Sequence, residues 1–151
     1  MDSDAHPDLR LDDTAAEQLE PDRATLEAVG KITEALETVE IARGHLYAFH
    51  QLTGSADEKL GQGIALLRDA GHAEHADRLA EHLLGRNVLH GRWTFQIVEE
   101  YDATYYREFH DHETRVRELT RGVRHLAEAR VKRENRTPGL AGHEATPNSR
   151  G

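Results

Sequence analysis

Four polar side chains interrupt the apolar stripes of two stretches with helical periodicity: Arg43 and His50 in the first, and Asp102 and His112 in the second. A charged group is costly to bury without a partner, so a charge on such a stripe needs explaining. Antiparallel pairing of the stretches places Arg43 opposite Asp102 or Tyr105. Either an Arg43–Asp102 ion pair fixes the helix register, or these groups line a polar pocket. We favour the ion pair.

The pocket interpretation predicts a small-ligand site between the two long helices. Its centre is the start of the second stretch, where the only tryptophan lies and where a helix N-terminus favours anions. The candidate ligand-binding residues are Arg43, His45, His50, Trp93, Glu99 and Asp102. The alternative, which we favour, is that Trp93 and Phe95 only close the end of the bundle, with Glu99 in solvent.

The chain contains eleven histidines and no cysteine, so any transition-metal site would depend on imidazole and carboxylate ligands. Ligands on a helix must be three or four residues apart to share a face, and His72 and His75 satisfy this spacing. Helical di-iron bundles use Glu-x-x-His, but no glutamate here has a histidine three residues later. We therefore predict no cofactor and no metal site, with a bound metal as the weaker alternative.

The hydrophobic pattern predicts an all-α fold of two long antiparallel helices plus a short helical hairpin, like a four-helix bundle. The long helices are expected at 22–52 and 92–134. The hairpin is expected at 56–70 and 73–84, because Gly54 is a natural stop and residues 55–58 match a capping box.

Residues outside this pattern define the domain organisation. Residues 1–21 are predicted to be a flexible acidic arm that ends at Pro21, and residues 136–151 are predicted to be a disordered tail rich in glycine and proline. One helical domain at 22–135 remains between them, with Asp22 as the expected cap of its first helix.

The unequal helix lengths predict self-association. Long helices of roughly 45 and 60 Å cannot both be covered by a hairpin whose arms span roughly 20 Å. The half formed by residues 22–36 and 112–133 is therefore expected to expose apolar surface, which includes Ile32, Val116, Leu119 and Val123. We predict a homodimer through the long helices that completes the bundle. The alternative is that the tail folds back over this surface.

Charge is divided along the chain and limits the classes of partner. Residues 1–40 carry a net charge of −9, and residues 115–151 a net charge of +5, so the ends can pair within the protein. The overall charge of −9 argues against nucleic acid. The sequence has no apolar run long enough for a membrane span. Its acidic start is unlike a signal peptide, and with the absence of cysteine this predicts a cytoplasmic protein.

Five segments of the sequence are distinctive when taken together: residues 32–40, 42–47, 49–54, 85–89 and 91–102. In these segments the chain resembles a family of small, uncharacterised helical proteins from actinobacteria. The excess of arginine over lysine agrees with such a high-GC origin. The resemblance implies no activity.

We therefore predict a non-catalytic structural or interaction protein that has a protein partner or a second copy as its partner. The alternative is a helical bundle that binds a small ligand or a metal in the polar pocket, with or without catalysis. Whether the protein is an enzyme stays open.

Overall fold

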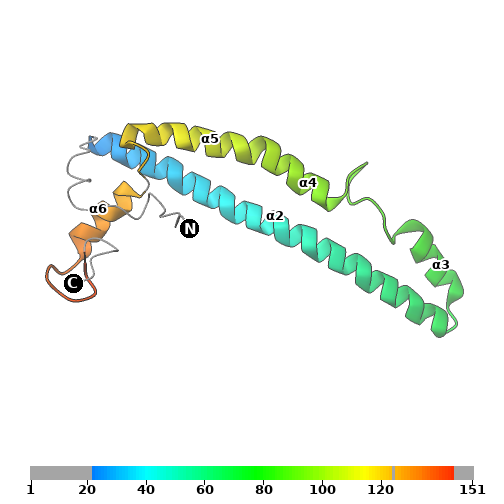
Figure 1. Ribbon diagram of the computed structural model, residues 1–151. Coiled ribbons are helices and arrows are strands. Elements are labelled where there is room, and N and C mark those ends of the chain that lie inside the picture. Colours follow the sequence, from blue (N-terminus) through cyan, green and yellow to red (C-terminus); the bar gives the residue numbers. More distant parts are fainter. Residues whose placement is uncertain (1–21, 124, 145–151) are drawn as a thin grey trace, which may run out of the picture. The chain divides into compact units, whose positions relative to one another are not determined.

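The computed structural model describes residues 22–123 and 125–144 (Figure 1). Within these residues the secondary structure consists of helices without a β-strand, so the predicted all-α class is confirmed. The predicted arm at 1–21 and the last part of the predicted tail, 145–151, lie outside the described residues. None of the helices in the described part is both long and apolar enough to cross a membrane.

The first helix, α2, covers Arg23–Asp69 and is 47 residues long. Its start is the one that the sequence predicts. The Asp22 carboxylate accepts hydrogen bonds from the backbone N–H of Thr25 at 2.8 Å and from the Thr25 hydroxyl at 2.8 Å. These bonds satisfy a backbone donor that the first turn leaves free and hold the pKa of Asp22 below its ordinary value.

The predicted helix end at Gly54 is wrong, because α2 continues through the first arm of the predicted hairpin, 56–70 (Figure 1). The second arm, predicted at 73–84, is confirmed as the helix Ala73–His82. A glycine inside a helix costs about 0.5–1 kcal/mol, which burial of the apolar face beyond it can offset. Ile64, in the continued part, is only 2% exposed. No proline lies between Pro21 and Pro138 to force a break. The helix ends instead at the turn around Gly71, whose φ of 86° favours glycine.

After α2 the chain forms a short helix, a loop and a second long helix. The elements are α3 (Ala73–His82), α4 (Thr94–Tyr101), the π-helix η2 (Asp102–Tyr106), α5 (Arg107–Val116), the 3-10 helix η3 (Arg117–Thr120) and α6 (Leu126–Asn135). Those from α4 to η3 join end to end. The predicted single helix at 92–134 is therefore wrong at its C-terminal end. It breaks where Arg121, Gly122 and His125 have positive φ values, and Gly122 is the weak point visible in the sequence.

The described chain divides into two compact units. Among the described residues, the first comprises 22–38 and 108–144 without 124, and the second comprises Val39–Arg107. In the first unit α6 packs against α2, because a Cβ atom built on Gly30 would lie 3.1 Å from the Cβ of Ala127. The apolar surface expected to stay exposed in this unit is therefore partly covered by the returning chain. Of the four residues named for it, Val116 and Val123 are half-buried, and Ile32 and Leu119 are exposed.

The second unit has a small core and a large exposed apolar surface. Its buried residues include Ile64, Ala76 and Val98, one from each of α2, α3 and α4. Yet twelve of the sixteen exposed large apolar side chains of the described residues belong to this unit. The sequence analysis expected the hairpin to cover the apolar side chains of this unit, but most of the exposed apolar side chains lie here. The reason is that the first hairpin arm is a continuation of α2 itself, so it does not fold back along the earlier part of that helix.

Candidate functional site

The polar residues on the two apolar stripes meet in the second unit as a bidentate ion pair. Arg43, on α2, donates from Nε to Asp102 Oδ1 at 2.7 Å and from Nη2 to Asp102 Oδ2 at 2.9 Å. The two side chains are 29% and 32% exposed. Two parallel N–H···O bonds are the strongest geometry that a guanidinium and a carboxylate can form. The ion-pair interpretation of Arg43 and Asp102 is therefore confirmed.

Aromatic rings surround the Arg43 guanidinium. Its Cζ atom lies 5.1 Å from the ring centroid of Tyr47 and 5.0 Å from that of Tyr106, both within the range of cation–π attraction. The Tyr106 hydroxyl donates to Glu40 Oε1 at 2.6 Å. The guanidinium is thus held by a carboxylate and two rings from its own chain.

These contacts change the proton affinities of the groups. The hydrogen bonds from Arg43 hold the pKa of Asp102 below its ordinary value, and the bond to Asp102 raises the pKa of Arg43. The hydrogen bond to Glu40 raises the pKa of Tyr106, because the protonated hydroxyl is the donor. Burial raises the pKa of Tyr101. Near neutral pH Arg43 is therefore charged, Asp102 is ionised and Tyr106 is protonated, as the ion pair and the Tyr106–Glu40 hydrogen bond require.

The π-helix η2 shifts the buried face of the second long helix by one residue. The predicted stripe passed through Tyr105 and His112. In the structure Tyr105 is 55% exposed and Tyr106 contacts Arg43, while the His112 side chain is 66% exposed and Glu113 is buried. A π-turn inserts an extra residue into the helical repeat, which accounts for the shift. No pattern in residues 102–106 predicted it.

The six predicted ligand-binding residues do not converge on one pocket. His50 Nδ1 lies 2.7 Å from the Thr94 hydroxyl, and its ring meets the Tyr47 ring edge to face, with centroids 6.5 Å apart. Trp93 is 59% exposed and contacts Phe95 edge to face, with ring centroids 5.7 Å apart. The other two predicted residues, His45 and Glu99, are exposed.

A cavity of about 680 Å³ opens beside Trp93 in the second unit. Its wall combines apolar side chains with a few polar ones. The main lining residues are Asp57, Leu60, Leu83, Arg86, Val88 and Trp93. Asp57 shapes it by accepting a hydrogen bond from the backbone N–H of Gly85 at 2.9 Å. Of the six predicted residues only Trp93 lines this cavity.

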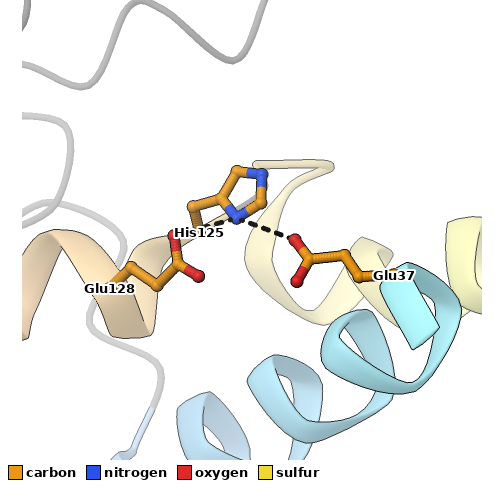
Figure 2. A group of neighbouring side chains, drawn as sticks. All are labelled: Glu37, His125 and Glu128. Atoms are coloured by element: carbon orange, nitrogen blue, oxygen red, sulfur yellow. Dashed lines mark ion pairs between the residues drawn. The ribbon is translucent and has the colours of Figure 1, made fainter. Parts of the chain in front are cut away.

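A second group of chemically capable side chains lies in the first unit (Figure 2). The Nδ1 atom of His125 lies 3.8 Å from Glu37 Oε1 and 3.3 Å from Glu128 Oε2. These three residues border a cavity of about 340 Å³. One imidazole and two carboxylates suit a divalent transition metal. An ordinary surface cluster of polar side chains would have the same arrangement, because the Glu37 and Glu128 side chains are 50% and 69% exposed.

The sequence prediction missed a buried polar cluster in the first unit. Glu113 is 1% exposed, accepts a hydrogen bond from the Thr33 hydroxyl at 3.0 Å and pairs with Arg117 Nε at 2.8 Å. Its second oxygen, Oε2, is buried without a hydrogen bond from the described residues. The i, i+4 spacing of Glu113 and Arg117 resembles that of an ordinary surface pair, so it gave no signal of burial.

Comparison with known proteins found no relative of the chain. No protein-family model, no curated protein and no solved structure matches the chain.

Proposed function

We propose that the protein is a non-catalytic interaction protein that works as a homo-oligomer. One observation carries the proposal: the second unit, Val39–Arg107, holds twelve of the sixteen exposed large apolar side chains of the described residues. Apolar side chains scattered singly are normal on a monomer, whereas their concentration on one part of the surface is typical of an interface.

The contacts of Arg43, Asp102, Tyr47 and Tyr106 support a structural role for these polar residues rather than a catalytic one. The Arg43 guanidinium already pairs with the Asp102 carboxylate and contacts two tyrosine rings. A ligand anion would have to displace a bidentate carboxylate of the same chain to reach it. The cluster therefore joins α2 to the second long helix within this unit.

The function is tested by native mass spectrometry and sedimentation equilibrium of the untagged full chain. A mass twice that of the chain, whose fraction rises with protein concentration, is the expected result. A mass equal to one chain at every concentration would refute the proposal.

A second candidate function is the binding of a small ligand, which the cavity beside Trp93 favours. Its volume of about 680 Å³ falls in the usual range for ligand pockets, about 300–1,000 Å³. Trp93 is the only tryptophan, so its fluorescence reports on this cavity alone. Binding of the apolar dye ANS should quench Trp93 and should weaken in Val88→Asp. The same change at Leu140, an exposed leucine of the other unit, is the control.

The remaining parts of the proposal concern location and cofactors. We propose a cytoplasmic protein with no resident metal and without nucleic acid as a partner, on the grounds of its acidic charge and its missing cysteines. Treatment with EDTA should leave the melting temperature unchanged. A lower melting temperature after EDTA would mean that a metal is bound, with Glu37, His125 and Glu128 as the first ligands to test.

A further inference from the structure

One face of α2 in the second unit carries three large apolar side chains that the described residues leave exposed. Ile41 is 64% exposed, and Leu52 and Leu66 are each 68% exposed. At 3.6 residues per turn these three residues fall within about 40° of one another around the helix. The opposite side of the helix holds Arg43 and Asp57, which bind Asp102 and the backbone of Gly85. We call the uncovered side, from Ile41 to Leu66, the outer face.

The outer face has the residue spacing of a helix–helix interface. Its positions recur at intervals of three and four residues, which is the heptad pattern of paired helices. They are Ile41, His45, Ala48, Leu52, Ser55, Lys59, Gln62 and Leu66. Large apolar residues stand at both ends and at Leu52 near the middle, and two small residues, Ala48 and Ser55, flank Leu52, which lets a second helix approach closely there.

Charge is nearly absent from this face. Between Ile41 and Leu66 the only charged residues are Arg43, Asp57, Glu58 and Lys59. The first two are engaged on the inner side of the helix. The N-terminal part of α2 differs, since residues 23–40 carry six charges in eighteen positions. The loss of charge therefore coincides with the apolar stripe.

We propose that the occupant of the outer face is a second copy of the chain, paired antiparallel about a two-fold axis near residues 53 and 54. This inference rests on the proposed function and names its partner and geometry. In this arrangement Ile41 packs against Leu66 of the partner subunit, and Leu66 packs against Ile41 of the partner subunit. Both ends of the stripe then coincide, so its whole length is covered.

The distribution of charge selects the antiparallel arrangement over the parallel one. A parallel two-fold pair would place Lys59 against Lys59 of the partner subunit, and like charges directly opposite each other destabilise a pair. The antiparallel pair places Lys59 against Ala48 of the partner subunit, where the lysine stem can pack and the ammonium can reach solvent.

The size of the face sets the expected strength. Its 26 residues span about 39 Å, and with a helix width of about 10 Å the footprint is on the order of 400 Å² per copy. A standard interface covers about 800 Å² per partner, so the dimer should be reversible, with a dissociation constant in the micromolar range.

Sedimentation equilibrium of full-length variants tests the surface. Leu52→Lys places two lysines near the two-fold axis and should weaken dimerisation by about tenfold or more. Leu89→Lys is the matched control, because Leu89 is 54% exposed in the same unit but lies outside α2. A wild-type dimer that Leu52→Lys leaves intact would overturn the inference and leave the proposed function standing. A monomeric wild type would overturn both.

Disulfide formation tests the direction, since the chain contains no cysteine of its own. A mixture of Ile41→Cys and Leu66→Cys chains should give a disulfide-linked heterodimer on mild oxidation. Ile41→Cys alone should not cross-link, because its two copies would lie about 37 Å apart along the axis at 1.5 Å per residue. Efficient cross-linking of Ile41→Cys with itself would show a parallel pair and refute the antiparallel one.

Discussion

The substitution Glu113→Gln should destabilise the protein far more than its position in the sequence suggests. Glu113 is 1% exposed and pairs with Arg117, whose side chain is 11% exposed. Glutamine has nearly the same shape and can still accept the hydrogen bond of the Thr33 hydroxyl. The change therefore removes the negative charge and leaves the Arg117 charge without its partner.

Removing one partner of a buried ion pair costs about 3–5 kcal/mol. Because Arg117 keeps a little solvent contact and the bond to Thr33 survives, we expect the lower end, about 3 kcal/mol. A loss of 1 kcal/mol lowers the melting temperature of a chain of this size by about 2–4 °C, so the melting temperature should fall by about 6–12 °C.

Urea unfolding followed by circular dichroism measures this loss. Glu134→Gln is the matched control, because Glu134 forms the same i, i+4 pair with Arg130 in the same unit but its side chain is 62% exposed. It should change the free energy of unfolding by less than about 0.5 kcal/mol. Adding Arg117→Met to Glu113→Gln should recover most of the loss, since no unpaired charge then stays buried. A Glu113→Gln variant as stable as the control would refute the argument.

Two further predictions concern the ion pair and the glycines of α2. Asp102 has a pKa lowered from 3.8, so its pairing stabilises the folded state above that pH, and this contribution is lost as the pH falls through the lower folded value. The stability difference between wild type and Arg43→Gln should therefore shrink in acid, and a difference independent of pH would contradict this. Gly44→Ala should stabilise by about 0.5–1 kcal/mol, because its Cβ would meet no atom within 4 Å. Gly30→Ala should gain less or lose stability, because its Cβ would lie 3.1 Å from Ala127; equal gains in thermal melts would refute this.

Local patterns were sufficient where one interaction dominates. The period of the apolar residues predicted an all-α chain because only a helix places such residues on one face. Asp22 predicted the start of α2 because a capping carboxylate satisfies the first free backbone donors. The Arg43–Asp102 ion pair could be predicted because each residue is a charge on an otherwise apolar stripe, and burying either charge without a partner would be costly. The predicted arm and the dimer are not tested by these contacts and stay predictions.

The same patterns failed where burial competes with a local signal. Gly54 and the capping box after it predicted a break worth about 1 kcal/mol, and burial of residues such as Ile64 outweighs it. The six residues of the predicted ligand site do not share one pocket, for a related reason. Its members were chosen by stripe position, but Trp93 faces a cavity formed with the loop at 83–93, which a single-helix pattern does not describe.

The sequence by itself determined the helical class, the start of α2 and the Arg43–Asp102 pair, because each follows from interactions between near neighbours or from a single costly charge. Only the tertiary structure decided which face of the second long helix is buried. The π-turn at Asp102–Tyr106 shifts that face by one residue, so Glu113 is enclosed and His112 is exposed. The π-turn leaves no mark on the local pattern of apolar residues. The contacts that it makes possible are with residues far away in the chain, such as the hydrogen bond from Thr33 to Glu113.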